Sequence, residues 1–426
     1  MVSLVNIATK QLVQSPARDA SAPHHVASAG ERPDAVEQPP VLILGGEANA
    51  LSVARDLGRL GAKVFMLGES GTPVRHSRYC NWIELESSAK GSFETIWADF
   101  LLGSDSDYLK GAVVLACSDA GITVLATHRD RLSRKFRLDE SNTIAQLDML
   151  DKLKTYHHAV AAGVPTPKFW EVHTRADVLA IEKELVYPLL VKPRLSHVFE
   201  KHFGRKHVTV TAFEQLLAAY DTAAGAGMDM MLVELIPGGD EQLCSYYTYL
   251  DAQGNALVHF TKRIIRRFPT GMGSACYHIT DWNPNLTELG LKLFRHVGLR
   301  GLANVEFKQD PRDGVYKLIE CNARFTASNC LVSASGCNLA ALVYNRITGR
   351  PVKPTTTDYR RGLRLWDPVR DFWAFRELQQ RGEITFVQWV SSVMHRQTFP
   401  FFRLSDPKPA LARTLKPLGR LFRRRS

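Results

Sequence analysis

The chain has 426 residues, of which 45% are hydrophobic and 23% charged, and its formal net charge is +11 at pH 7. This length exceeds what one hydrophobic core usually serves, so we expect two or three domains of an ordinary globular protein. No run approaches the ~18 apolar residues that span a bilayer, no export signal is expected at the N-terminus, and seven cysteines without a CxxC pair argue against a disulfide framework or a zinc site.

Residues 1–38 are rich in Ala, Ser, Pro and His, and we expect a disordered extension there. Residues 39–150 alternate strands with helices, which predicts a parallel α/β domain with strands at 41–44, 64–67, 81–85 and 111–117. The first strand ends at Gly45 and Gly46, and Glu69 follows the second strand. This arrangement resembles a dinucleotide fold, but the third glycine is missing, so it favours such a cofactor only weakly.

The pattern of helix and strand signals over residues 151–235 predicts a second domain. A helix begins at Asp151, runs through Val160 and ends at Gly163, and short apolar strands carry Lys192 and Glu234. In a third domain over residues 236–355, we expect long strands at 242–250 and 256–263, joined by a turn at 251–255.

A set of oxygen ligands lies in the same third domain. Glu306 occupies one apolar stretch, Glu320 and Asn322 occupy the next, and residues 310–314 between them are turn formers. Side chains alternate faces along a strand, so Glu320 and Asn322 share one face and a hairpin brings Glu306 beside them. Such ligands suit magnesium that also carries nucleotide phosphates, whereas the alternative is a solvated acidic face.

Residues 356–426 predict a packed appendage, including a helix from Phe386 to Met394, that ends in a basic tail. From Pro407 to Ser426 there are seven basic residues and no acidic one, with leucines at helical spacing. An amphipathic helix on an anionic membrane surface and a disordered solubilising tail both account for this pattern. Pro417 is expected to interrupt the helix. The tail lacks interleaved aromatic residues, which disfavours nucleic-acid binding.

The order of these features over residues 40–350 resembles the ATP-grasp superfamily. It is most similar to the carboxylate–amine ligase branch, which contains D-aspartate ligase-like proteins. The resemblance implies an ATP-grasp fold of mixed α/β and α+β class, with an N-terminal parallel α/β domain, a small lid and an antiparallel β domain. The segments that carry it are Asp151-Lys152, Gly163-Val-Pro165, Val191-Lys192-Pro193, Val233-Glu234-Leu-Ile-Pro-Gly, Glu306, and Glu320-Cys-Asn322-Ala-Arg324.

The resemblance also implies a role for each site residue. ATP would be clasped between the lid and the β domain, with Lys152 and Lys192 at its phosphates and Arg324 stabilising the phosphoryl group. The remaining expected ligands are Glu234, Leu235 and Ile236 for adenine, Glu241 for the ribose, and Glu306, Glu320 and Asn322 for one or two Mg²⁺ (or Mn²⁺) ions.

Two further stretches bear on the site. Residues 194–207 replace the glycine-rich loop of many family members with a single glycine and several basic side chains. Residues 262–274 combine four basic residues with two glycines, which fits a cradle for an anionic acceptor and equally a basic surface strand.

The implied reaction activates a substrate carboxylate, in one hypothesis an amino acid, as an acyl phosphate that an amine attacks to form an amide. The alternatives are a bicarbonate-activating enzyme of the carboxylase or carbamoyl-phosphate type and a non-catalytic nucleotide-binding protein. We expect a cytoplasmic enzyme, with the inner face of the membrane as a second possibility through the basic tail. A homodimer is an expectation from the resemblance alone.

Overall fold

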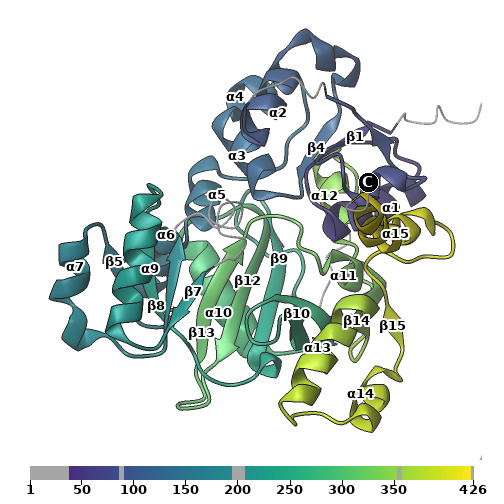
Figure 1. Cartoon of the computed structure of the whole chain (residues 1–426). Helices are drawn as coiled ribbons and strands as arrows, with labels where there is room; N and C mark the ends of the chain where they lie inside the picture. The colour runs from purple at the N-terminus through teal and green to yellow at the C-terminus, as the bar shows by residue number, and fades with distance from the viewer. Residues whose placement is uncertain (1–37, 86–90, 194–206, 353–356, 424–426) are drawn as a thin grey trace, which may run out of the picture. The chain divides into compact units, whose positions relative to one another are not determined.

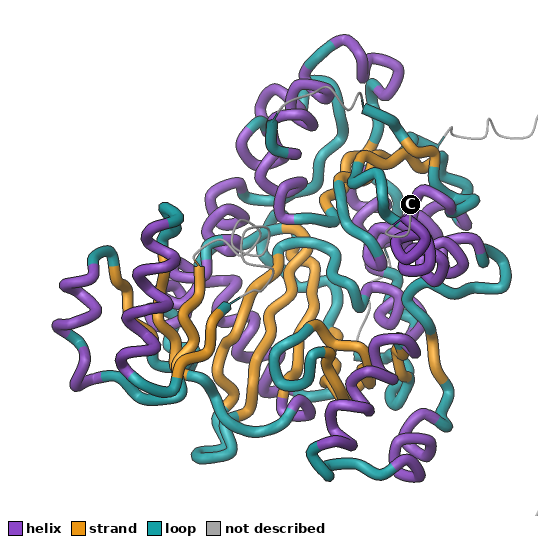
Figure 2. The backbone as a smooth tube through the Cα atoms, in the orientation of Figure 1, coloured by secondary structure: helices purple, strands orange, loops and turns teal. Residues whose placement is uncertain are grey.

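The computed structural model describes residues 38–85, 91–193, 207–352 and 357–423, with the backbone alone for residues 416–423. These residues form three sheets, shown in Figures 1 and 2. Nearly all of the predicted extension over residues 1–38 and of the glycine-poor stretch 194–207 lies outside the described residues. Short 3₁₀ helices occur at Pro73–His76 (η1), Ser104–Leu109 (η2), Glu182–Glu184 (η3) and Asp240–Gln242 (η4).

The first sheet is parallel, with strand order β3-β2-β1-β4, as the alternating pattern predicts. Its strands are β1 (Val41–Leu44), β2 (Val64–Leu67), β3 (Asn81–Trp82) and β4 (Val113–Ala116), so β3 is shorter than expected. Its helices are α1 (Ala48–Arg59), α2 (Phe93–Leu102), α3 (Asp119–Thr127) and α4 (Arg129–Leu132). A Cβ atom at Gly45 would lie 2.2 Å from Ser118 Oγ, so this glycine permits close packing against the β4–α3 turn.

The second sheet is antiparallel, with strand order β5-β8-β6-β7, and the end of β6 carries Lys192. Two helices, α5 (Thr143–Leu150) and α6 (Lys152–Ala161), precede it in the chain. Its strands are β5 (Phe169–Val172), β6 (Leu189–Pro193), β7 (Val208–Val210) and β8 (Met230–Glu234). Helices α7 (Arg175–Ala180) and α9 (Phe213–Gly225) contribute Val178 and Leu216 to its core.

The third sheet has the order β13-β12-β9-β10-β11-β14-β15 and is antiparallel except for its last pair. Its strands are β9 (Leu243–Leu250), β10 (Phe260–Phe268), β11 (Ser274–Asp281), β12 (Gly301–Gln309), β13 (Tyr316–Asn322), β14 (Arg364–Trp366) and β15 (Gln397–Thr398). The expected strand start at Ala256 is wrong, because that residue forms only an isolated bridge with Leu250. Strands β14 and β15, which extend this sheet, were not predicted from the sequence.

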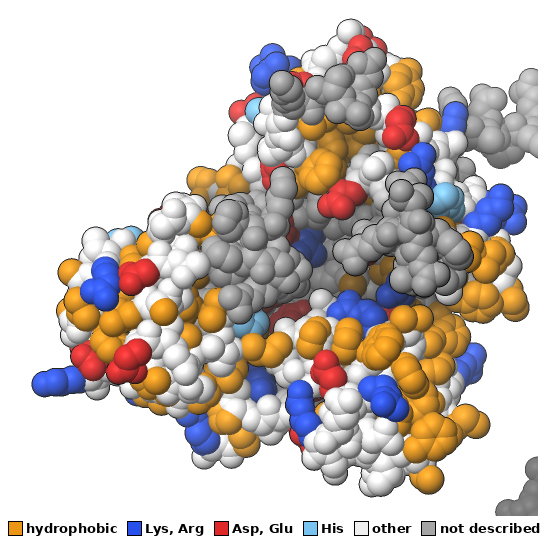
Figure 3. Space-filling model, viewed as in Figure 1, with side chains coloured by type: hydrophobic (Ala, Val, Ile, Leu, Met, Phe, Trp, Pro, Cys, Tyr) orange, Lys and Arg blue, Asp and Glu red, His pale blue; other side chains and the backbone are white. Residues whose placement is uncertain are grey.

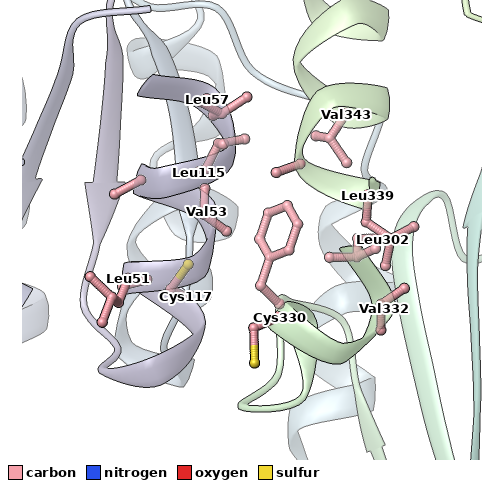
Figure 4. Close-up of a cluster of buried hydrophobic side chains, with 14 of the residues drawn as sticks. Leu51, Val53, Leu57, Leu115, Cys117, Leu302, Cys330, Val332, Leu339 and Val343 are labelled. Carbon is pink, nitrogen blue, oxygen red and sulfur yellow. The ribbon is translucent and has the colours of Figure 1, made fainter. Parts of the chain in front are cut away.

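The two faces of the third sheet are buried by different helices. On one face, α10 (Pro284–His296) packs its Leu293 and Phe294 among Tyr246, Val305 and other strand residues. On the other side, helices α11 (Asn329–Ser335) and α12 (Leu339–Ile347) meet α1. Figure 4 shows the resulting core, which joins the first sheet to the third through side chains such as Leu51, Val53, Leu302, Val332 and Val343.

The C-terminal helices are α13 (Pro368–Gln380), α14 (Phe386–Val393) and α15 (Lys408–Arg423). The helix expected from Phe386 is confirmed as α14. The expectation that Pro417 interrupts the last helix is wrong, since α15 runs through it. A proline inside a helix costs about 3 kcal/mol, which makes such a helix less favourable without forbidding it.

Candidate active site

The predicted β12–β13 hairpin is present and brings the oxygen ligands together. Glu306 lies directly opposite Glu320, and Asn304 lies opposite Asn322, whose Nδ2 donates to Asn304 Oδ1 over 3.3 Å. Residues two apart along a strand share a face, so all four side chains project from the same side of the sheet. Cys321 points the other way into the core, as the predicted alternation requires.

Two lysines meet the acidic hairpin. Lys152 is the first residue of α6, whose N-terminus is capped by Asp151, and its Nζ lies 3.3 Å from Glu320 Oε1. Lys192 is buried at the end of β6. Burial and the positive charge of Lys152 lower the pKa of Lys192 to about 8, against the opposite effect of Glu320. Two cations and a carboxylate therefore meet between α6, β6 and β13.

Arg324 lies two residues beyond Asn322, and its guanidinium pairs with the carboxylate of Asp119 at 2.5 Å. Burial opposes its charge, but Asp119 outweighs this effect and the pKa of Arg324 is raised. Asp119 was not among the residues predicted from the sequence, although a signal was present. It is the first residue of α3, directly after β4, and ligands of parallel sheets bind at the carboxyl ends of the strands.

The segment predicted to read adenine follows β8. Glu234 accepts a hydrogen bond from the amide of Lys168 (3.1 Å) and pairs with Arg312 (2.7 Å), while the amide of Leu235 donates to the carbonyl of Pro188 (3.1 Å). The side chain of Glu234 therefore fixes the segment in place. The carbonyl of Ile236 accepts a hydrogen bond from Lys308, which lies on β12.

Lys308 is a second residue that the sequence analysis missed. It lies two residues after Glu306 on β12, and its Nζ donates to the carbonyls of Ile236 (2.9 Å) and Gly238 (2.7 Å). Glu241, the predicted ribose ligand, lies exposed in η4 just beyond this turn. Strand β12 therefore carries both a predicted metal ligand and the side chain that positions the turn after β8.

The basic stretch 262–274, for which a cradle for an anionic acceptor and a basic surface strand were both open, is largely neutralised within the protein. Arg266 forms a buried two-point pair with Asp371 (2.6 and 2.9 Å), Arg267 pairs with Asp240 (2.7 Å), and Arg263 lies 3.4 Å from Asp281. A guanidinium matches a carboxylate in two-point geometry, so the buried Arg266 stabilises the fold, whereas the exposed pair of Arg263 contributes little.

Lys262 differs from these arginines, because its side chain lies on the same face of the third sheet as that of Glu306. Ser245 lies opposite both residues in neighbouring strands, and Lys262 Nζ donates to Ser245 Oγ at 3.1 Å. The buried His278 is close by on β11, and burial together with Lys262 lowers its pKa well below the ordinary value. Among the described residues, His278 Nδ1 has no hydrogen-bond partner.

Comparison with known proteins shows similarity to an ATP-binding domain and to ligases of amino acids. Residues 279–351 match the family model "Carbamoyl-phosphate synthase L chain, ATP binding domain". The D-aspartate ligase of Enterococcus faecium (strain Aus0004) is 26% identical over 347 residues, which cover 76% of this chain and 81% of that protein. The D-alanine–D-alanine ligase of Anaplasma marginale (strain Florida) is 29% identical over 181 residues, which cover 41% of this chain and 51% of that protein, about half of its length.

Solved structures share the fold. The biotin carboxylase domain of the Hydrogenobacter thermophilus 2-oxoglutarate carboxylase matches 77% of this chain and 74% of its own, with a TM-score of 0.60 and 18% identity. The L-amino acid ligase of Bacillus licheniformis matches 75% of this chain and 76% of its own, with a TM-score of 0.55 and 19% identity. These structures confirm the expected multidomain fold of mixed α/β and α+β class. No helix among the described residues is long and apolar enough to cross a membrane.

Proposed function

We propose that the chain is an ATP-dependent carboxylate–amine ligase of the ATP-grasp superfamily, which activates the carboxylate of an amino acid as an acyl phosphate for attack by an amine. The supporting observation is the meeting of Lys152 and Lys192 with Glu320, beside Glu306 on the same face of the hairpin. Cations for a polyphosphate and oxygen ligands for its counter-ion therefore lie together.

Lys152 and Lys192 would hold the phosphates of ATP. Lys192 has lost its hydration on burial, so the negative charge of a bound polyphosphate would raise its pKa back toward the ordinary value. The backbone from Glu234 to Ile236 would contact adenine, and Glu241 would bind the ribose. Lys308 would act as a positioning residue, because it fixes the turn between these two contacts.

The oxygen ligands fit magnesium or manganese only in combination with phosphate. In the part of the chain that the structure describes, no group of three or more His, Cys, Asp or Glu residues could hold a metal ion. Glu306, Glu320 and Asn322 provide two carboxylates and one amide, and magnesium typically combines one or two carboxylates with substrate phosphates and water. The bound ion would neutralise charge on the transferring phosphoryl group.

The chain's own residues would then serve two steps. First, a carboxylate oxygen of the substrate attacks the γ-phosphorus, the bond to ADP breaks, and Arg324 and Lys192 stabilise the charge on the transferring group. Second, the neutral amine attacks the acyl carbon, phosphate leaves with the bonding electrons, and the amine's surplus proton passes to solvent. The protein contributes position and charge rather than covalent chemistry.

The position of Asp119 beside Arg324 favours an amino acid as the substrate that supplies the carboxylate. The carboxylate of Asp119 lies against Arg324, and Arg324 also lines a small, mostly apolar cavity whose other polar residues are Arg129, Asp139 and Gln146. A substrate with an ammonium group beside its carboxylate would meet both charges, the ammonium at Asp119 and the carboxylate at Arg324. The printed names of the relatives, D-aspartate ligase and D-alanine–D-alanine ligase, agree with this substrate class.

The test is incubation of the protein with Mg-ATP, pooled amino acids and hydroxylamine, followed by measurement of ADP and hydroxamate. Hydroxylamine captures an acyl phosphate, so the unaltered protein should form both products. Glu320→Gln should form neither, because it removes one of the two carboxylates at the proposed metal site. Glu383→Gln is the matched control: this exposed carboxylate lies between α13 and α14, and its loss should leave both products unchanged.

The other outcomes separate the alternatives. ADP without hydroxamate would favour bicarbonate, or a substrate without a carboxylate, as the acceptor of the phosphoryl group. Repeating the assay with added bicarbonate would distinguish these two possibilities. Full activity of Glu320→Gln would contradict the metal assignment. Binding of ATP without either product across the pool would favour a nucleotide-binding protein without turnover.

A further inference from the structure

The turn between β10 and β11 contacts the second sheet. It spans residues 269–273, and its Met272 Sδ lies 3.3 Å from His207 Nε2 and 3.7 Å from Thr209 Oγ1. Thr209 belongs to β7, and His207 directly precedes that strand. The third sheet therefore reaches the edge strand of the second sheet through the side chain of Met272.

Helix α13 holds this turn in place. Its Glu377 accepts hydrogen bonds from the amide and the hydroxyl of Thr270, both at 2.8 Å. Its Arg370 donates to the carbonyl of Phe268, the last residue of β10, at 2.6 Å. Figure 3 shows apolar side chains at the lower right, where α13 lies in Figure 1, so this helix is exposed on one side while another side binds the turn. The backbone of the turn is fixed, whereas the side chain of Met272 stays 39% exposed.

Arg267 joins the same turn to the segment after β8. Its amide and its Nε donate to the two carboxylate oxygens of Asp240 at 2.9 and 2.7 Å, and its guanidinium also donates to the carbonyl of Gly271. Asp240 is the first residue of η4 and directly precedes Glu241, the proposed ribose ligand. Only 16% of the Arg267 side chain and 11% of the Asp240 side chain are exposed, so solvent screens this ion pair little.

These contacts connect the two proposed ends of the nucleotide site. Strand β7 pairs with β6, and β6 carries Lys192, the proposed phosphate ligand. On the other side, Asp240 lies beside the proposed ribose ligand. Arg267 and Met272 lie between the two, so one series of contacts runs from the ribose end to the phosphate end.

We propose that Arg267 and the β10–β11 turn position Lys192 relative to the segment after β8, with Met272 as the contact to the second sheet. This inference rests on the proposed ATP site. Arg267 acts through the turn rather than on the substrate, so it is a positioning residue. The sulfur of methionine is a weak hydrogen-bond acceptor on a flexible side chain, so its contact with β7 can break and form again at little cost.

The first expected effect concerns the affinity for ATP. Without its support, the second sheet should occupy the binding arrangement less often, and the apparent affinity falls by the same factor. Met272→Ala and Arg267→Gln should each raise the KM for ATP at least about fivefold. Saturating ATP restores the arrangement, so kcat should change by less than about twofold. The assay is ADP formation with hydroxylamine and the amino acid identified by hydroxamate formation.

Hydrogen–deuterium exchange of the full chain tests the support without relying on turnover. In nucleotide-free Met272→Ala, the amides of residues 207–212 should exchange at least about threefold faster, whereas those of β12 and β13 should not change. Arg267 binds the turn rather than β7, so Arg267→Gln should increase exchange in β7 only through the turn. The double variant should therefore exchange at the rate of Met272→Ala alone.

Arg263→Gln and Met394→Ala are the matched controls. Arg263 lies on β10, as Arg267 does, and also pairs with an aspartate, Asp281, but this ion pair is exposed. Met394 is 75% exposed at the end of α14. Neither control should change the KM for ATP or the exchange of residues 207–212.

Three results would overturn the proposal. One is unchanged exchange of residues 207–212 in Met272→Ala, and another is a uniform increase throughout the protein, which would show only lost stability. The third is strict additivity in the double variant, which would mean that Arg267 does not act through Met272. Failure of the unaltered protein to form ADP would instead count against the proposed function, and the exchange results would still decide whether the turn supports β7.

Discussion

Lys192 shows, for a single residue, how a proposed catalytic group opposes stability. Burial and the charge of Lys152 lower its pKa to about 8, from an ordinary 10.5. Below pH 8 the folded protein therefore holds the charged ammonium group of Lys192 in a buried site beside Lys152. The unfolded chain binds the proton of this group more tightly. Stability should rise with pH between about 8 and 10.5 as this penalty disappears.

Lys192→Met should consequently stabilise the nucleotide-free protein at pH 7, by about 3 kcal/mol on the pKa difference. The gain should vanish above pH 11, where the lysine is neutral in both states. The same variant should lose ATP binding, because the proposed phosphate contact is gone. Urea unfolding across pH and titration with ATP check both parts, and a destabilised variant at pH 7 would contradict the electrostatic argument.

The residues of the candidate site differ in how far the sequence could predict them. Glu306, Glu320 and Asn322 lie on neighbouring strands of one hairpin, so strand alternation alone placed them on one face. Asp119 and Arg324 are 205 residues apart in sequence and meet only because the first sheet packs against the third. No local pattern predicts that contact, nor the salt bridges that neutralise Arg266 and Arg267.

The turn of the β12–β13 hairpin connects the proposed metal ligands to the segment after β8. Asp310 is fully buried and accepts hydrogen bonds from Arg312 and Lys317, and Arg312 also pairs with Glu234. These donors, Arg312 first, hold the pKa of Asp310 well below its ordinary value, against the effect of burial. The ionised carboxylate therefore stabilises the fold above about pH 4, and this contribution is lost as pH falls further.

Asp310→Asn should destabilise the protein by about 2 kcal/mol at pH 7, since the buried side chain loses the negative charge that binds the half-exposed Arg312 and the largely buried Lys317. The difference from the unaltered protein should shrink below pH 4. Asp313→Asn in the same turn is the control, because an exposed asparagine can still accept the bond from the amide of Val315. Denaturant unfolding at several pH values is the measurement, and a difference that does not depend on pH would rule the mechanism out.

Helix α10 packs against the third sheet through a glycine. A Cβ atom at Gly290 would lie 2.4 Å from Tyr246 Cδ1 and 3.1 Å from Val305 Cγ1. Tyr246 cannot withdraw freely, because it is fully buried and its hydroxyl bonds to His259 Nδ1 at 2.8 Å. Gly290→Ala should therefore destabilise the protein by about 1–3 kcal/mol, even though alanine favours a helix.

Glu288→Ala on the exposed side of the same helix should change stability by less than about 0.5 kcal/mol. Urea midpoints of the two variants provide the comparison. A stabilised Gly290→Ala variant would mean that α10 can move away from the sheet.

Elements were easier to predict than the contacts between them. The parallel sheet, α6, the β12–β13 hairpin and α14 follow from apolar periodicity and turn residues, because these signals are local. Strands β14 and β15 were missed, since each is very short and finds its partner far away in the sequence. Helix α15 was expected to break at Pro417. It continues through this residue despite the free-energy cost of a proline inside a helix.

For the described molecule as a whole, a buried ion pair joins its beginning to its end. Arg55 of α1 lies 2.9 Å from Asp406, which also accepts hydrogen bonds from Ser77 Oγ (2.7 Å) and from the amide of Arg78 (3.0 Å). Arg55 and Asp406 are 351 residues apart and both almost fully buried. The segment before α15 is therefore an integral part of the fold around the first sheet.

Asp406→Asn should cost about 3–5 kcal/mol, because the guanidinium of Arg55 would stay buried without a counter-charge. Adding Arg55→Met should recover part of this loss, so the double variant should be more stable than the sum of the single changes predicts. A double-mutant cycle by denaturant unfolding tests this. Strict additivity would show that the pair does not couple the two ends.

In the proposed reaction, the enzyme transfers the γ-phosphoryl group of ATP to a substrate carboxylate. The direct measurement uses the amino acid identified by hydroxamate formation, labelled with ¹⁸O in its carboxylate, together with Mg-ATP and the amine. An acyl phosphate delivers one carboxylate oxygen to the phosphate that leaves, so mass spectrometry should find one ¹⁸O atom in each phosphate released. Phosphate without ¹⁸O, formed together with the amide, would contradict carboxylate activation by phosphorylation.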